Sequence, residues 1–325
     1  MPVRLHSTVG RLMRLLLVAC ALCAATAWAQ FPSRPVRFIV PFPPGGSADL
    51  IARSVAQAMG QGLGQPIIVE NRAGADGMIA GEAVMKAAPD GHTLLFATNT
   101  AFNAAPMMHK NVPYDPLVDF TPVGGVGSFG FFVFVHDGVP AKTLSQMFDY
   151  ARANPGKLAY GSGNSTSIVA TARLAQQAGV DMVHVPYKGD APMTLDLLAG
   201  RIQVAVATGT LLPHAKDGKL RILATLLPAR APLLPDVPTL PEAGAGAMTI
   251  TSWAGLFGPA KMPPAVVERL ARELKRALTQ PDVREQLEKL AFAPQFSSPD
   301  ELGELLRNQL ELWRKAGKEA GIVAQ

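Results

Sequence analysis

Short apolar segments alternate with amphipathic segments along most of this chain, and this alternation restricts the fold more than any other feature of the sequence. Short apolar runs bounded by Gly, Pro and Asn are typical of buried strands. The segments between them carry apolar residues at the three- and four-residue spacing of a helix, as Ile51, Val55, Ala58 and Met59 do. Strands that alternate with helices form βαβ units with a parallel sheet. The sequence therefore predicts an α/β fold.

The expected elements can be placed along the chain. Strands are predicted at Val36–Val40, Ile67–Glu70, Thr93–Ala97, Gly130–Val135, Leu158–Tyr160, Met182–Val185, Ile202–Ala207, Leu220–Ala224 and Ser252–Phe257. Helices are predicted at Ala48–Gly60, Met78–Ala87, Leu144–Asn154, Ser167–Gly179, Ala191–Ala199 and Leu211–Asp217. After Pro259 the pattern is helical only, with helices from Ala265, from Pro281 and after a Ser298–Glu301 cap. We expect this tail to fold back over the first lobe.

The first 29 residues have the three parts of a signal peptide. Three arginines precede an apolar run from Leu15 to Ala27, and Ala27-Trp28-Ala29 is a small-x-small cleavage site. The run is too short for a transmembrane helix. Leu17-Val18-Ala19-Cys20 also resembles a lipobox, so anchoring at Cys20 is an alternative to soluble export. The sequence predicts a protein exported to the periplasm.

Removal of the leader changes the composition in two ways. Both cysteines, Cys20 and Cys23, lie in the leader, so the mature chain has no thiol for catalysis, a disulfide or a metal site. The leader holds three of the 30 basic residues and no acidic one, which leaves 27 basic against 25 acidic residues, a net charge of +2. The remaining charges alternate in sign without a basic run among aromatic residues, so nucleic acid is not expected as a partner.

The remaining 296 residues have the length of two ordinary lobes. Glycine-rich crossings between the lobes are expected at Gly124–Gly130 and Thr249–Gly258, and both could act as hinges. The first lobe is predicted to comprise residues 30–128 and 253–325, and the second lobe residues 129–252.

Polar clusters follow five of the predicted strands, where open α/β sheets bind their ligands. After the first strand, backbone N–H groups at the start of a helix are predicted to hold an anion. The candidate residues are Pro44, Gly45, Gly46 and Ser47, then Asp76 and Gly77 in a glycine-rich loop, Thr98, Asn99 and Thr100, then Ser162, Asn164, Ser165 and Ser167 in the segment 160–167, and Tyr187 with Lys188. Each has a plainer reading: a capped turn, a surface loop or, for Lys188, a solvated lysine.

The sequence gives no sign of catalysis, of a metal or of a cofactor. The histidines of the mature chain are His92, His109, His136, His184 and His214, and none has metal-ligand spacing. Gly161-Ser162-Gly163 is neither a phosphate loop, nor a dinucleotide turn, nor a nucleophile elbow. We therefore expect a binding protein rather than an enzyme.

Several motifs along the mature chain resemble those of one family. They are Pro41-Phe42-Pro43-Pro44-Gly45-Gly46-Ser47-Ala48-Asp49, Val69-Glu70-Asn71-Arg72, Pro89-Asp90-Gly91, Tyr114-Asp115-Pro116, Val185-Pro186-Tyr187-Lys188-Gly189, Leu234-Pro235-Asp236-Val237-Pro238-Thr239 and Thr251-Ser252-Trp253. In these motifs the chain resembles the Bug/TctC periplasmic solute receptors of tripartite tricarboxylate transporters.

The resemblance implies a two-lobed type II periplasmic binding protein fold, the Venus flytrap, with a C-terminal helical tail. It implies a monomer without a cofactor that closes on one small organic carboxylate and serves the membrane subunits of a tripartite tricarboxylate transporter. The carboxylate would be held by the loops at 44–47, 74–77, 98–100 and 162–167, partly through ordered water. Thr208 follows a second-lobe strand and joins this set.

Two departures from the family pattern bear on the ligand. Asp76 places a negative charge in a carboxylate-binding loop, where it either faces solvent or recognises a cationic part of the ligand. Amino-acid-binding relatives tend to carry an aspartate where this chain reads Ala207-Thr208-Gly209, and an ammonium group without an acidic partner is costly to bury. The departures point in opposite directions, and we expect a non-amino organic acid. A sensor subunit and an exported enzyme acting on small carboxylates are the alternative functions.

Overall fold

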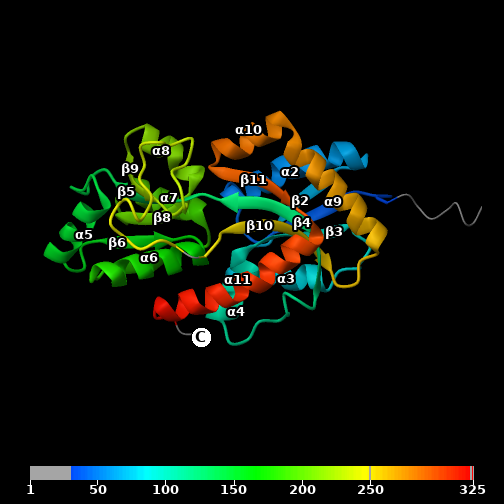
Figure 1. Cartoon of the computed structure of the whole chain (residues 1–325), viewed down its shortest axis with the longest axis horizontal. Coiled ribbons are helices and arrows are strands. Elements are labelled where there is room, and N and C mark those ends of the chain that lie inside the picture. The colour runs from blue at the N-terminus through cyan, green and yellow to red at the C-terminus, as the bar shows by residue number, and fades with distance from the viewer. Residues whose placement is uncertain (1–30, 249, 323, 325) are drawn as a thin grey trace, which may run out of the picture.

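The computed structural model describes residues 31–248, 250–322 and 324, so the predicted leader lies outside the described residues. Two α/β lobes lie side by side along the long axis of the molecule, each built on its own sheet (Figure 1). This arrangement confirms the predicted two-lobed α/β fold. In the part of the chain that the structure describes, no helix combines the length and the apolar character needed to span a membrane.

The first lobe contains a six-stranded mixed sheet in the order β11-β4-β10-β3-β1-β2. Its strands are β1 (Val36–Val40), β2 (Ile67–Asn71), β3 (Thr93–Thr98), β4 (Phe120–Phe129), β10 (Trp253–Pro259) and β11 (Phe292–Ser297). β1 is parallel to β2 and β3, to which it is connected through the helices α2 (Ser47–Leu63) and α3 (Met78–Met85). β10 is antiparallel to β3 and β4, so the lobe is not built from βαβ units throughout. The carboxyl ends of β1 and β3 share one edge of the sheet, where a ligand site is expected.

The second lobe contains a five-stranded sheet in the order β7-β6-β8-β5-β9. Its strands are β5 (Phe131–His136), β6 (Ala159–Ser162), β7 (Val183–Pro186), β8 (Val204–Thr208) and β9 (Leu220–Thr225). Its helices are α5 (Leu144–Ala153), α6 (Ser165–Ala178), α7 (Asp190–Leu198) and the short α8 (Leu212–Lys216). β6 is parallel to both β7 and β8, so α6 and α7 begin at the same edge of the sheet. The strand β5 lies between β8 and β9, is antiparallel to both, and follows directly from the first lobe.

The C-terminal helices cover the first lobe, as the sequence predicts. α9 (Pro264–Thr279) and α10 (Pro281–Lys289) pack on α2, whereas α11 (Pro299–Glu319) lies against β4. α11 also extends toward the second lobe (Figure 1), where Trp313 shares a buried cluster with Val169 of α6. The tail therefore connects the two lobes in addition to covering one of them.

The crossings between the lobes are shorter than the sequence suggests. Residues 124–129 belong to β4, which is hydrogen-bonded to β10 on one side and β11 on the other, so the predicted hinge Gly124–Gly130 is wrong over most of its length. The chain leaves the first lobe at Gly130, whose N–H donates to the carbonyl of Ala291 at 2.8 Å. The return crossing ends at Ser252, because Trp253 already begins β10. Thr249, the first residue of the second predicted crossing, lies outside the described residues.

The strand β11 contradicts the expectation that the chain is helical only after Pro259. It pairs antiparallel with β4, between α10 and α11. Its burial alternates over Phe292–Gln295, and Pro294 is tolerated because β11 is the last strand of the sheet. So short an alternation between two helices is a weak signal, and the pairing with β4 determines the strand.

Local signals at helix ends are confirmed. Ser298 caps α11 through a reciprocal box, with its Oγ accepting from the Glu301 N–H and its own N–H donating to the Glu301 carboxylate. Thr143 caps α5 by accepting from the Gln146 N–H at 3.2 Å, and the Gln146 side chain accepts from the backbone N–H of Lys142. These caps depend on four neighbouring residues, and for this reason they are readable from the sequence.

Candidate ligand-binding site

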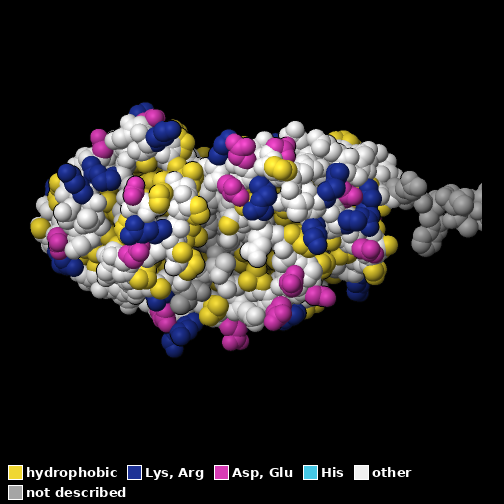
Figure 2. All heavy atoms as spheres, turned by 45° about the horizontal axis from the view of Figure 1, so that its top comes forward, with side chains coloured by type: hydrophobic (Ala, Val, Ile, Leu, Met, Phe, Trp, Pro, Cys, Tyr) yellow, Lys and Arg dark blue, Asp and Glu magenta, His cyan; other side chains and the backbone are white. Residues whose placement is uncertain are grey.

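A pocket of about 470 Å³, its open mouth included, lies between the two lobes. Figure 2 shows a groove in the surface where the two lobes meet. The first lobe lines the pocket with Phe42, Pro43, Gly46, Ser47, Ala48, Thr98, Asn99, Thr100 and Phe129, and the second lobe with Phe131, Asn164, Thr166, Gly189, Asp190, Ala191 and Thr208. No Lys, Arg or His is among these residues, so any charge on a bound anion would have to be met by neutral donors.

The N-terminus of α2 forms the first-lobe end of the pocket. β1 delivers the chain to this point and Gly46 is the N-cap, so the N–H groups of Ser47 and Ala48 lie in the first turn, where a helix has no internal partners for them. The hydroxyls of Ser47 and Thr98 are buried, and neither has a hydrogen-bond partner among the described residues. Unpartnered hydroxyls and the positive end of a 17-residue helix therefore border the same pocket.

The turn before α2 is held by Asp49. Its carboxylate accepts from the Gly45 N–H at 3.0 Å, from the Arg53 guanidinium at 3.0 Å and from the Asn71 amide at 2.8 Å. Burial raises the pKa of Asp49, but these bonds outweigh it and bring the pKa below its usual value. The Gly45 N–H is therefore already engaged. Pro44 and Gly45 are exposed, and the structure does not place them on the pocket.

Asn99 and Thr100 line the pocket and also connect the lobes. The Asn99 amide donates to the Thr166 hydroxyl at 2.9 Å, and the Ser165 hydroxyl donates to that of Thr100 at 3.1 Å. Thr100 opens η2 (Thr100–Ala104), a π-helical turn of a kind common at functional sites. The predicted polar loop after β3 is thus a buried helical turn that holds the lobes together.

The segment 160–167 contributes less to the pocket than expected. The Ser162 hydroxyl bonds to Nε2 of His184 at 2.6 Å, and Ser167 completes a capping box with Asn164 at the start of α6. Ser162, Ser165 and Ser167 are buried and lie off the pocket, whereas Asn164 lines it. All four of these hydroxyl and amide side chains make bonds within the protein, so their role in binding stays a prediction.

A second cavity of about 550 Å³ adjoins the pocket through Asn164. It is lined by Asp76, Gly77, Tyr187 and Lys188, all of which the sequence analysis singled out. These residues therefore lie beside the interlobe pocket rather than on it. Thr208, in contrast, lies on the pocket at the end of β8.

The polar groups of the second cavity have partners of their own. The Asp76 carboxylate is 2.6 Å from Nε2 of His109, and the Tyr187 hydroxyl donates to Asp196 at 2.8 Å. Burial and the neighbouring Asp196 carboxylate raise the pKa of Tyr187 to about 12. Asp76 thus bonds to an imidazole of the protein itself. The sequence analysis considered only solvent or a cationic part of the ligand as its surroundings.

Several pocket residues were not among the candidates. The sequence does not reveal the apolar walls, because Phe42, Phe129 and Phe131 look like core residues. Thr166 stands inside the polar segment 160–167, and Asp190 directly follows the motif that contains Tyr187 and Lys188, so the sequence marks both regions without distinguishing these two side chains.

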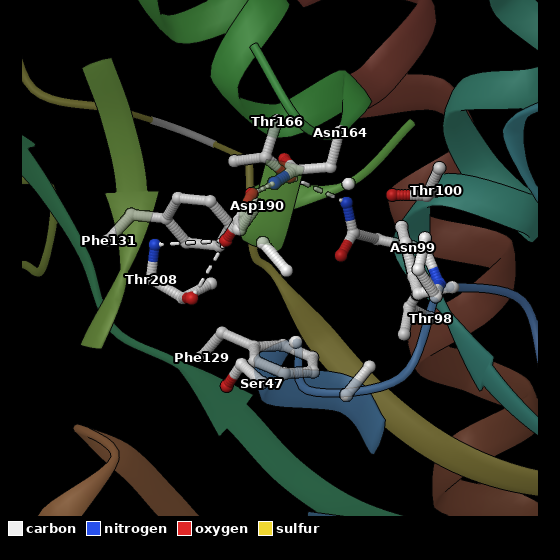
Figure 3. Close-up of a pocket in the computed structure, with 16 residues that line it drawn as sticks. Ser47, Thr98, Asn99, Thr100, Phe129, Phe131, Asn164, Thr166, Asp190 and Thr208 are labelled. Atoms are coloured by element: carbon white, nitrogen blue, oxygen red, sulfur yellow. Dashed lines mark hydrogen bonds between the residues drawn. The ribbon is translucent and has the colours of Figure 1, made fainter. Parts of the chain in front are cut away.

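Asp190 is a carboxylate buried to 8% exposure at the first position of α7. It accepts from the Thr208 hydroxyl at 2.8 Å and from the Asn164 amide at 3.0 Å (Figure 3). Burial raises the pKa of Asp190, and the bonds from Thr208 and Asn164 only partly oppose this rise. A titratable acid therefore forms the second-lobe end of the pocket.

Among the described residues, one Ser–His pair resembles part of a catalytic triad but lacks its third member. Ser162 and His184 are hydrogen-bonded, and the Tyr160 ring stacks on the imidazole at 4.8 Å, but no carboxylate of the described residues bonds to His184 and the pair lies off the pocket. Within residues 31–248, 250–322 and 324, no group of three or more His, Cys, Asp or Glu side chains is arranged to hold a metal ion. The geometry supports binding of a small molecule.

Comparison with known proteins agrees with this architecture. The family model described as "Tripartite tricarboxylate transporter family receptor" (TctC) matches residues 51–322. A UPF0065 protein from the tcbD-tcbE intergenic region of Pseudomonas sp. strain P51 is 37% identical, over 95% of this chain and 94% of its own.

Three solved structures share the fold over nearly their whole length. Rpa4515 of R. palustris with adipate has a TM-score of 0.88 at 30% identity, covering 91% of this chain and 100% of its own. The periplasmic binding protein BugD has a TM-score of 0.86 at 30% identity, with the same coverage. MatC of Rhodopseudomonas palustris with bound malate has a TM-score of 0.82 at 32% identity, covering 88% of this chain and 99% of its own.

The two-lobed fold, the interlobe pocket and these matches lead to one assignment. The chain belongs to the Bug/TctC family of periplasmic solute-binding receptors.

Proposed function

We propose that this protein captures a small organic carboxylate in the periplasm and delivers it to the membrane subunits of a tripartite tricarboxylate transporter. The observation that carries the proposal is a pair of buried hydroxyls on the pocket that have no partners among the described residues, Ser47 Oγ at the N-terminus of α2 and Thr98 Oγ1 at the end of β3. A buried donor without a partner costs free energy, and a carboxylate oxygen is the acceptor that would relieve that cost.

The site suits an anion in both charge and geometry. The first turn of α2 presents N–H groups, and the helix dipole favours negative charge within that turn. Hydrogen bonds to a charged partner contribute about 1.5–3 kcal/mol each. A micromolar Kd corresponds to a binding free energy of about −8 kcal/mol. Several such bonds can supply this free energy without a lysine or arginine, even after the cost of ordering the ligand is subtracted.

Two further points support the proposal. Relatives with the same fold are described with adipate and with malate, which are both small dicarboxylates. The predicted signal peptide over residues 1–29 would place the mature chain on the side of the membrane where such receptors work.

A screen of purified mature protein against small organic acids tests capture. A carboxylate present at about a hundred times its Kd should add about 2.7 kcal/mol to the free energy of unfolding, and calorimetry should give one site per chain. Steady conversion of the tightest ligand would favour the exported-enzyme alternative. If no acid in a panel of aliphatic and aromatic carboxylic acids stabilises the protein, the carboxylate assignment is wrong.

Delivery to a transporter is tested in cells. Deletion of the gene should abolish uptake of the bound carboxylate, and restoration of the full-length chain should recover it. Normal uptake combined with a lost transcriptional response to the same carboxylate would favour the sensor alternative instead.

A further inference from the structure

Asp190 is unlike the other buried aspartate of the site region. Asp49 is paired with Arg53, whereas Asp190 has only the neutral donors Thr208 and Asn164 around its carboxylate. None of the ion pairs found among the described residues includes Asp190. Burial of a carboxylate without a cation is costly unless something else supplies the countercharge.

The surroundings of Asp190 are nevertheless built for the ionised form. Thr208 donates both its hydroxyl, at 2.8 Å, and its N–H, at 3.4 Å, to Oδ2, and the Asn164 amide donates to Oδ1 at 3.0 Å. Asp190 is also the first residue of α7, where the helix dipole favours an anion. A carboxylate has about four acceptor positions. The three donors leave one for a group in the pocket.

The two ends of the pocket therefore have opposite chemistry. The first-lobe end offers unpartnered donors at Ser47 and Thr98, whereas the second-lobe end offers the Asp190 carboxylate. A dicarboxylate that spanned this pocket would place its second negative charge against Asp190 in a poorly solvated space, which disfavours binding. Phe129 and Phe131 form part of the wall and can face a cation as well as an alkyl chain.

We propose that the ligand carries a protonated amine together with its carboxylate, as an amino acid does, and that Asp190 binds the amine while the N-terminus of α2 binds the carboxylate. This inference rests on the proposed function, because it assumes that a carboxylate occupies the first-lobe end. It replaces the expectation of a non-amino acid: no aspartate follows β8, but α7 brings Asp190 against Thr208 at the end of that strand.

Matched ligand sets test the amine directly on the mature protein by titration calorimetry at pH 7, where the amines are charged. The sets are L-aspartate, L-malate and succinate, then L-glutamate, 2-hydroxyglutarate and glutarate, and finally 6-aminohexanoate and adipate. Loss of one partner of a buried charge pair typically weakens binding by at least about 30-fold. In the set that fits the pocket, we expect the amine to bind at least about 30-fold more tightly than its diacid or hydroxy-acid counterpart.

A variant assigns the preference to one residue. Asp190→Asn should weaken the amine ligand by at least about 30-fold and leave its amine-free counterpart unchanged or tighter. Asp217→Asn removes the same charge from an exposed site of the same lobe, outside the pocket, and should change neither Kd by more than twofold. Circular dichroism checks the fold of each variant, and the comparison on the unmodified chain decides the question even if Asp190→Asn does not fold.

The possible failures are distinguishable. If the diacids or hydroxy acids bind as tightly as the amines, or if Asp190→Asn weakens both kinds of ligand equally, the amine assignment is wrong and carboxylate capture stands. If neither the members of these sets nor any other carboxylate binds, both the amine assignment and the proposed function are wrong.

Discussion

Replacement of Ser47 by Ala should change ligand affinity and stability in opposite directions. The Ser47 side chain is 4% exposed, its hydroxyl has no hydrogen-bond partner among the described residues, and it makes no capping bond in α2. In the ligand-free protein, Ser47→Ala removes an unsatisfied buried group, so unfolding should become about 1 kcal/mol less favourable. For a chain of this size that gain corresponds to a rise in Tm of about 2 °C.

The same change should weaken binding, because a hydrogen bond from Ser47 to a ligand carboxylate contributes about 1.5–3 kcal/mol, or roughly 10- to 150-fold in Kd. Thr171→Val is the matched control: its hydroxyl is also buried and without a described partner, but it lies in α6 and off the pocket. That variant should gain similar stability and bind normally. Differential scanning fluorimetry and calorimetry measure both quantities. If Ser47→Ala folds and binds with an unchanged Kd, the carboxylate does not sit at the N-terminus of α2.

Three more predictions follow from the pocket. Lys188→Met should weaken binding by at most about 1 kcal/mol in calorimetry, because Lys188 is exposed and lies on the adjoining cavity. Gly46→Val should abolish binding without unfolding the protein, because Gly46 lines the interlobe pocket. Gly46 has φ −78° and ψ 165°, and an added Cβ would meet only a carbonyl oxygen at 3.7 Å, so a folded variant that still binds would contradict the site. Small-angle scattering should give a smaller radius of gyration with ligand than without it, if the lobes open about Gly130 and Ser252; equal radii at saturation would count against closure. Finally, burial raises the pKa of the Asp190 carboxyl above its ordinary value of 3.8. The protonated carboxyl therefore stabilises the folded protein fully at pH values below 3.8, and this stabilisation is lost as the pH rises through the raised pKa. The Tm of ligand-free Asp190→Asn, relative to the unmodified chain, should therefore increase from pH 4 to pH 8, and a difference that stays constant would show that the folded pKa is not raised.

Local features of the sequence determined most of the secondary structure. Each of the predicted strands overlaps an observed one, because short apolar runs between turn residues bury well in a sheet. The start of α2 after Gly46 and the cap of α11 at Ser298 depend on neighbouring residues, so they could be recognised without the fold. The polar loops after strand ends, several of which line the interlobe pocket, were predictable for the same reason.

The use of each polar side chain was decided by the tertiary structure. From the sequence, the Gly45 N–H and the Ser162 hydroxyl are both candidate donors to a ligand. In the folded chain Asp49 and His184 occupy them, because packing brings these residues within hydrogen-bond distance.

Partners remote in the sequence explain the rest. β11 is a strand because β4 lies beside it, and Asp190 belongs to the pocket because the parallel strands β6 and β8 bring α7 to the end of β8. Residue periodicity records which face of an element is buried, whereas contacts between remote segments are set by strand order and by the packing of whole lobes. For that reason the sequence by itself determined most of the elements and the edge of the sheet where we propose that a ligand binds, and only the tertiary structure decided that Ser47 and Asp190 share one pocket.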